Sequence, residues 1–118
     1  MSDVSELKSI FHQCMPLFIA LGDEIRLTII EALTDSAYRS SGTSPEDIGQ
    51  CGLNVRQITE RTSLSRPAVS HHLKILKEAG LVSLRREGTC NYYFLTISQC
   101  TGQLMHLGTE LQTFPGLL

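Results

Sequence analysis

Several familiar signatures are missing from this sequence. No run of apolar residues approaches the roughly 20 that a membrane-spanning helix needs, and no basic segment followed by an apolar one opens the chain as in a secretion signal. Cysteine pairs of the C-x-x-C type are absent, so the four cysteines are expected to be free thiols. We therefore expect one cytoplasmic domain over residues 1–118 with no membrane partner.

Motifs of enzymes are missing as well. There is no Gly-rich phosphate-binding loop, no G-x-S-x-G, and no pair of carboxylates near the adjacent His71 and His72. A general base needs a nucleophile or an acid within hydrogen-bonding reach, and a group that orients it. The sequence therefore predicts no catalytic residue, no cofactor and no enzyme.

Basic residues are concentrated in one segment, although the formal net charge of the chain is only −2. Between residues 56 and 86 there are seven basic and two acidic residues, which gives that segment a formal charge of +5 and leaves the rest acidic. A basic patch on an acidic body is typical of a phosphate-binding face, although a charged run is also common on an ordinary solvated surface.

Both ends of the chain show the apolar spacing of amphipathic helices. Apolar residues recur at alternating intervals of three and four in residues 4–21 and again in residues 98–114. Pro16 is expected to kink or break the first helix near Met15. The apolar positions are Val4, Leu7, Phe11, Cys14, Phe18 and Leu21 in the first helix and Leu104, Leu107, Leu111 and Phe114 in the last.

The middle of the chain predicts three more helices and a hairpin. Asp23 is expected to cap "DEIRLTIIEAL", whose apolar residues point in most directions and predict a central, buried helix. A loop is expected over 35–52, in which "SPED" (44–47) could form one helical turn. "LNVRQITERTSL" predicts a short helix, and Ser65 begins a longer one that Gly80 ends, a helix-turn-helix pattern. Two β-type runs then flank "EGT", where Gly88 supplies the positive φ of a hairpin turn.

The two adjacent histidines are expected to have different roles. Val69, Leu73 and Leu76 define the buried face of their helix. Successive helical residues are about 100° apart, so the two rings diverge and make a poor metal site, which on one helix favours a spacing of three or four. His72, at the edge of the buried face, is expected to be structural. His71 points outward, where it can donate to a base edge or a phosphate.

"FIALGDEIRLTIIEAL", and "LSRPAVSHHLKILKEAGLV" followed by "RREG…YYFL", resemble the ArsR/SmtB-type winged-helix transcriptional repressors over most of the chain. The resemblance implies a winged helix-turn-helix domain, mostly α-helical with a small β-hairpin: four helices, two strands and a fifth helix. It implies a homodimer that occupies a pseudo-palindromic operator in double-stranded DNA and leaves it when an effector binds. By position, the DNA-binding residues are Arg66, Pro67, Ala68, Ser70, His71 and Lys74 on the recognition helix and Arg85, Arg86, Gly88 and Thr89 on the wing.

The metal ligands of many relatives are missing from this chain. Where those relatives carry "L-C-V-C-D-L", this chain has "LNVRQI", so Asn54 and Arg56 replace both thiolates, and a cationic Arg56 would repel a metal ion. The zinc-ligating positions of the last helix fall around Ile97 and Gln99, and His106 stands alone. We therefore expect no metal site.

The sequence thus predicts a dimeric DNA-binding repressor with an unidentified inducing signal. The alternative is a winged-helix module that binds another protein. The terminal helices are expected to pair across a two-fold axis. Cys14 and Cys51 are candidate effector residues that a soft metalloid or an oxidant could bridge across the dimer. The simpler interpretation makes Cys14 a small hydrophobe and Cys51 a loop thiol, which leaves a small organic molecule as the effector.

Overall fold

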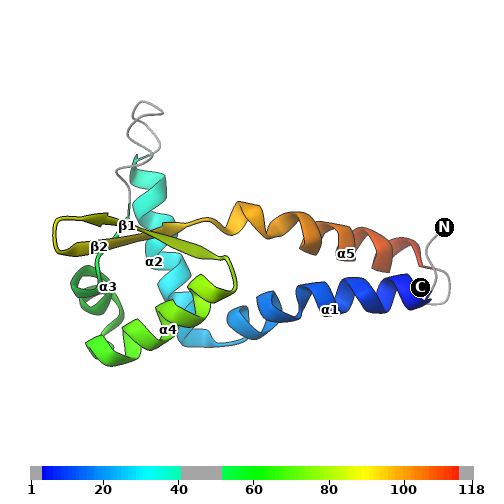
Figure 1. The fold of residues 1–118 in the computed structure, drawn as a ribbon, viewed down its shortest axis with the longest axis horizontal. Helices are drawn as coiled ribbons and strands as arrows, with labels where there is room; N and C mark the ends of the chain where they lie inside the picture. Colours follow the sequence, from blue (N-terminus) through cyan, green and yellow to red (C-terminus); the bar gives the residue numbers. More distant parts are fainter. Residues whose placement is uncertain (1–3, 41–51, 115–118) are drawn as a thin grey trace.

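The computed structural model describes residues 4–40 and 52–114, which form the expected winged helix-turn-helix (Figure 1). The prediction of a mostly α-helical chain with one hairpin is confirmed. None of the described helices is long and apolar enough to cross a membrane. The elements are, in order, α1 (Val4–Leu21), α2 (Glu24–Ser40), α3 (Val55–Thr62), α4 (Arg66–Glu78), β1 (Val82–Glu87), β2 (Cys90–Leu95), the 3-10 turn η2 (Ile97–Gln99) and α5 (Thr101–Thr113).

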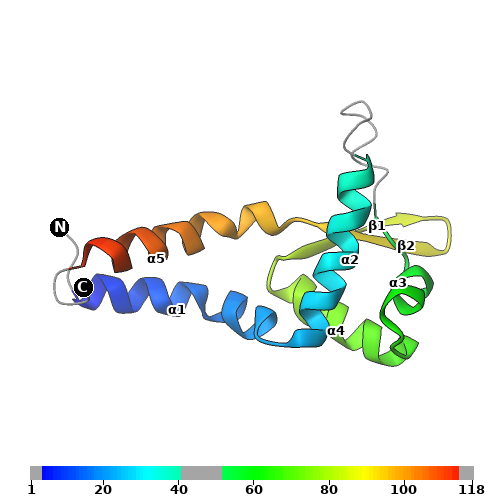
Figure 2. The same ribbon diagram turned by 180° about the vertical axis from the view of Figure 1, so that it is seen from behind.

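Helices α1 and α5 lie side by side and project as an arm from a body made by the other elements (Figures 1 and 2). A small buried cluster holds the arm together, with Leu7, Ile10 and Cys14 from α1 against Leu107 from α5. The body has a larger core, which includes side chains from α1, α2, α3, α4 and β1. Because the last turns of α1 contribute Leu17 and Ala20 to that core, α1 belongs to both clusters.

The buried stripe of α1 differs from the one expected. Val4, Phe11 and Phe18 are 54%, 40% and 40% exposed, although the sequence placed them on one seam with Leu7 and Cys14. The helix instead buries Leu7, Ile10, Cys14, Leu17 and Ala20. An apolar helix presents neighbouring stripes at spacings of three and four, and the rest of this chain covers only one of them.

Pro16 does not interrupt α1, so of the two alternatives expected near Met15 the break is wrong, while the kink stays a prediction. Proline cannot donate a hydrogen bond to the carbonyl four residues before it, which weakens a helix at that point. Buried contacts on both sides of the proline, made by Cys14 and Leu17, hold the turn in place.

Helix α2 is longer and less buried than expected. It continues to Ser40, so the predicted loop over 35–52 is wrong for residues 35–40, which contain neither glycine nor proline to end the helix. The predicted turn at 44–47 lies outside the described residues. Ile29 is fully buried, but Ile25 and Leu27 are 38% and 42% exposed, so the helix buries one face rather than its whole circumference.

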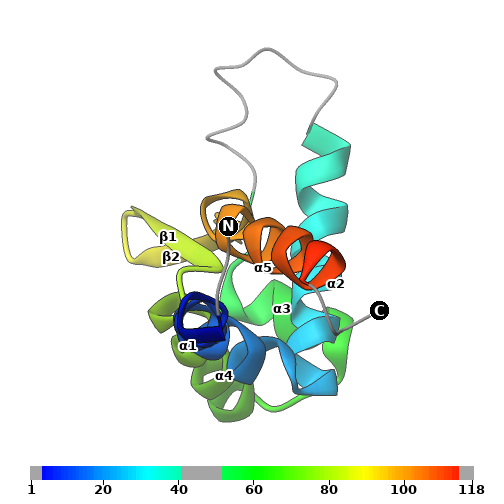
Figure 3. The same ribbon diagram turned by 90° about the vertical axis from the view of Figure 1, so that its right-hand side faces the viewer.

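Figure 3, which is viewed along the arm, shows that the hairpin projects to one side of the body. Strands β1 and β2 pair antiparallel from Val82 opposite Leu95 to Glu87 opposite Cys90. Gly88 at the tip has φ 62°, as the turn signal predicted.

Two backbone hydrogen bonds connect the hairpin to the segment that enters α3. The Leu53 N–H donates to the Tyr93 carbonyl at 2.9 Å, and the Tyr93 N–H donates to the Leu53 carbonyl at 2.8 Å. This bridge fixes the hairpin beside the beginning of α3.

Candidate nucleic-acid interface

Helix α4 begins at a side-chain cap and is anchored by one fully buried face. Ser65 Oγ accepts a hydrogen bond from the Ala68 N–H at 3.3 Å, and the first turn contains no acidic residue. Val69, Leu73 and Leu76 are all 0% exposed, as predicted. The buried face therefore fixes which side chains of α4 point away from the body.

The outward face of α4 carries the residues that the sequence singled out. Arg66, Pro67, Ser70, His71 and Lys74 are exposed, and Ala68 is half-buried. Arg66, Ser70, His71 and Lys74 carry hydrogen-bond donors or cations, which suit base edges and phosphates in a major groove.

His72 has the structural role expected for it, while His71 faces solvent. The Arg26 guanidinium lies 3.3 Å from His72 Nδ1, and because arginine can only donate, Nδ1 is the acceptor. The two imidazole rings contact edge to face, with centroids 5.5 Å apart. Within residues 4–40 and 52–114 no group of three or more metal-ligating side chains comes together.

Arg26 connects three elements of the fold. Its Nε donates to the Ala20 carbonyl at 2.7 Å, and its second terminal nitrogen donates to the Ile19 carbonyl at 3.0 Å. The same side chain reaches His72 on α4 and lies 3.8 Å from the Asp23 carboxylate. The end of α1, the cap of α2 and the recognition helix therefore share one guanidinium.

Asp23 caps α2 as predicted, and its environment favours the ionised form. Its Oδ1 accepts hydrogen bonds from the N–H groups of Ile25 and Arg26 at 2.8 and 3.3 Å. Desolvation opposes ionisation, but these two N–H groups and the charge of Arg26 together hold the pKa of Asp23 below its usual value.

A capping box begins α3. Asn54 Oδ1 accepts from the Gln57 N–H at 2.8 Å, and Gln57 Oε1 accepts from the Asn54 N–H at 2.9 Å. Asn54, which stands where many relatives carry a thiolate, therefore positions the helix. The N-x-x-Q spacing could have revealed this cap in the sequence, whereas nothing local predicts the contacts of Arg26.

The wing carries two arginines in different environments. Arg85 is opposite Tyr92 in the hairpin, with its guanidinium carbon 5.3 Å from the ring centroid, and its Nε donates to Glu87 at 3.0 Å. Arg86 is exposed, and its Nε donates to the Gly88 carbonyl at 3.2 Å. Neighbouring residues of a strand point to opposite faces, so the two arginines leave the hairpin on different sides. Thr89 is exposed at the tip.

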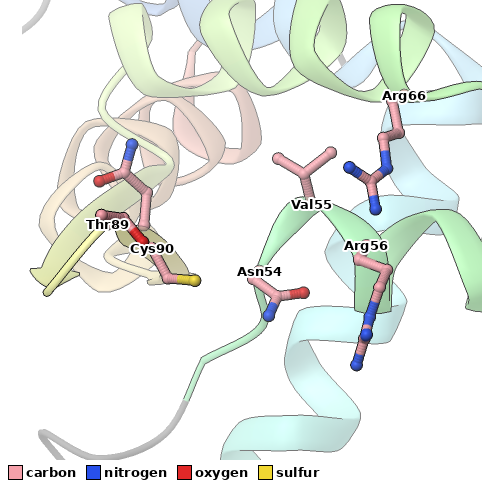
Figure 4. Close-up of a pocket in the computed structure, with 7 residues that line it drawn as sticks. Asn54, Val55, Arg56, Arg66, Thr89 and Cys90 are labelled. Carbon is pink, nitrogen blue, oxygen red and sulfur yellow. The ribbon is translucent and has the colours of Figure 1, made fainter.

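A concave pocket of about 500 Å³ lies between the wing tip and the beginnings of α3 and α4 (Figure 4). Arg56 and Arg66 lie on one side of it and Thr89 with Cys90 on the other, with Asn54 and Val55 between them. Asn91 completes the lining. The sequence placed Arg66 and Thr89 in one interface, and the pocket brings them together.

The structure describes one of the two candidate effector thiols. Cys14 is 0% exposed inside the arm, and Cys51 lies outside the described residues. Cys90 is exposed in the wing. Cys100 is half-buried beside the end of α4, with its Sγ 3.3 Å from the Gly80 carbonyl.

Helix α4 exposes hydrogen-bond donors, the capped helix α3 precedes it, and a basic hairpin follows it. Together these elements define a winged helix-turn-helix DNA-binding domain. A family model described as "Bacterial regulatory protein, arsR family" matches residues 52–83. The chain is also 32% identical over 85 residues to the uncharacterized HTH-type transcriptional regulator MJ1325 of Methanocaldococcus jannaschii, covering 72% of this chain and 80% of that protein. This chain belongs to the ArsR family of transcriptional regulators.

Solved structures share the fold. Reduced HlyU from Vibrio cholerae has a TM-score of 0.64 at 24% identity, with 95% of this chain and 99% of that chain covered. The winged helix-turn-helix domain of Mb0332 from Mycobacterium bovis, a possible ArsR-family regulator described as homodimeric, has a TM-score of 0.59 at 25% identity. That likeness covers 93% of this chain and 89% of that one. The family and MJ1325 are described as transcriptional regulators rather than enzymes.

Proposed function

We propose that residues 1–118 form one domain that acts as a homodimeric repressor and occupies a pseudo-palindromic operator through α4 and the wing. The observation that carries the proposal is the outward face of α4, where Arg66, Ser70, His71 and Lys74 are exposed beside a basic hairpin. Pro67 and Ala68 shape the first turn of that helix, and Gly88 shapes the wing tip. His71 and Ser70 read base edges, while the cationic side chains contact phosphates.

The arm supplies the surface for a second copy of the chain. Phe11, Met15 and Phe18 are 40%, 45% and 40% exposed at helical spacings of four and three, so they form one stripe on α1. Leu104 and Met105 add exposed apolar area on α5. A two-fold axis through this surface would bury both stripes and place two α4 helices about 34–36 Å apart, one turn of DNA.

Binding of the operator is tested by fluorescence anisotropy with the DNA upstream of the chain's own gene, titrated at several salt concentrations. Each neutralised phosphate contributes about −0.9 to the slope of log affinity against log salt. We expect a steep negative slope and preference over a scrambled duplex. A slope near zero would refute DNA binding and favour the alternative, a winged-helix module that binds another protein.

Release by a small effector completes the proposal. Cys14 and Cys51 are the candidate effector residues for a soft metalloid or an oxidant. Because Cys14 is 0% exposed, such a reagent has to open the arm, which would couple its binding to the dimer. Arsenite, zinc and peroxide added to the protein–operator complex, with a Cys14→Ser, Cys51→Ser variant as control, test this role. If the wild-type complex ignores all three, a small organic effector takes their place.

A further inference from the structure

The pocket between the wing and the two helix beginnings has a cationic lining. Its seven residues include two arginines and no carboxylate. Arg56 is on α3 and Arg66 is the first residue of α4, so the two guanidiniums come from different helices of the helix-turn-helix. Both side chains lie on the same side of the pocket in Figure 4, where the Arg56 guanidinium points away from that of Arg66. Two cations with no carboxylate in the same lining favour an anion in the pocket.

The two arginines are available to such an anion. Arg56 makes one long ion pair, 3.7 Å to Glu60, and both side chains of that pair are about two-thirds exposed (67% and 66%). Exposed pairs of this kind contribute little and exchange easily. No ion pair of Arg66 is found among the residues that the structure describes, and the Arg66 side chain is exposed.

The rest of the lining offers neutral donors. Thr89 contributes a hydroxyl group, and Asn91 contributes an amide. A phosphate group has several acceptor oxygens, and arginine forks match the geometry of those oxygens. The lining therefore fits one phosphate better than an apolar ligand or a metal ion.

We propose that this pocket binds a phosphate of the DNA backbone and that Arg56 is a phosphate-contacting residue of the interface, a role that the sequence did not assign to it. The inference rests on the proposed function. The pocket lies between α4, which would enter the major groove, and the wing, so the DNA strand that separates the two contacts has to pass over it. The flanking contacts favour DNA as the source of the phosphate over a free anion.

The first test compares Arg56→Gln with Arg61→Gln. Arg61 is on the same helix but lines a different concavity with Thr28, Glu31 and Asp35, so it is a matched control. Arg56 is exposed, so the substitution leaves the fold intact, which circular dichroism checks. Both variants are titrated against a specific duplex and a scrambled one.

We expect Arg56→Gln to reduce the magnitude of the salt slope by about 0.9 on both duplexes, because a phosphate contact carries no sequence information. When salt rises from 50 to 200 mM, the affinity of the variant for DNA should therefore fall by a factor about 3.5 times smaller than the factor for the wild type. Arg61→Gln should keep the wild-type slope. An unchanged slope for Arg56→Gln, in a wild type that binds DNA normally, overturns the inference and leaves the proposed function standing. A wild type that binds no DNA refutes both.

The second test uses Cys90 as a reporter inside the pocket, since its exposed thiol is part of the lining. A brief pulse of iodoacetamide on the wild-type protein, read by peptide mass spectrometry, gives the alkylation rate of each cysteine. Saturating duplex should slow alkylation at Cys90 several-fold and leave Cys100 unchanged. Equal rates with and without DNA overturn the inference. Protection by millimolar inorganic phosphate alone would assign the pocket to a free anion and also overturn it.

Discussion

Replacing Arg26 with methionine should destabilise the protein strongly, because one side chain satisfies three acceptors, two on α1 and one on α4. The Arg26 side chain is only 11% exposed, and its guanidinium donates to the carbonyls of Ala20 and Ile19 and to His72 Nδ1. Hydrogen bonds from a charged donor contribute about 1.5–3 kcal/mol each when buried. Water can replace the donor at Ile19, where the bond is exposed, so we expect a total loss of about 2–4 kcal/mol.

Urea unfolding followed by circular dichroism measures this loss. The comparison is made at one protein concentration, because the stability of a dimer depends on concentration. Lys77→Met, at an exposed position of α4, is the control and should change stability by less than about 0.5 kcal/mol. Arg26→Lys should fall between the two, since a single ammonium cannot reach all three acceptors.

A double-mutant cycle separates the contact with α4 from the contacts with α1. Arg26→Met and His72→Ala, made singly and together, should show a coupling energy of about 0.5–3 kcal/mol. If Arg26→Met loses no more than Lys77→Met does, the guanidinium does not hold these elements together and the reasoning fails.

Three further predictions concern pH, assembly and DNA recognition. The folded-state pKa of Asp23 is lowered, so its contribution to stability is complete above the ordinary aspartate pKa and is lost as pH falls through the lower folded value. Asp23→Ala should therefore flatten the dependence of stability on pH in this acid range, as acid unfolding curves would show. Phe18→Glu with Met105→Glu should give a folded monomer in sedimentation that no longer binds the operator, and a double variant that stays dimeric would contradict the assigned surface. His71→Ala should relax sequence preference in binding assays, whereas Arg85→Ala should weaken binding to all duplexes about equally; the reverse pattern would be inconsistent with their assigned roles.

The elements with strong local signals were predictable from the sequence. Ser65 and Gly80 mark the ends of the recognition helix, and Val69, Leu73 and Leu76 define its buried face without ambiguity. The capping residue, the spacing of the apolar residues and the terminating glycine all predict the same helix, so tertiary contacts have no local preference to override there.

Other features depend on contacts that a single sequence does not contain. Phe11 and Ile10 are both apolar, and only the position of α5 decides that Ile10 is covered while Phe11 remains exposed. The side chain of Arg26 reaches an acceptor 46 residues away, which no local pattern encodes. The pocket at Arg56 exists because the Leu53–Tyr93 bridge brings the wing to the beginning of α3.

Pro16 lies on α1 between the last residue of the arm cluster, Cys14, and the first residue of the body core, Leu17. One hydrogen bond of the helix is missing there, so the helix bends more easily at that point than elsewhere along its length. In a dimer joined through the arms, this compliant turn would let each body tilt without disturbing the shared surface. The two recognition helices could then accommodate operators whose half-sites differ slightly in separation, and the strain of that adjustment would be confined to a single turn.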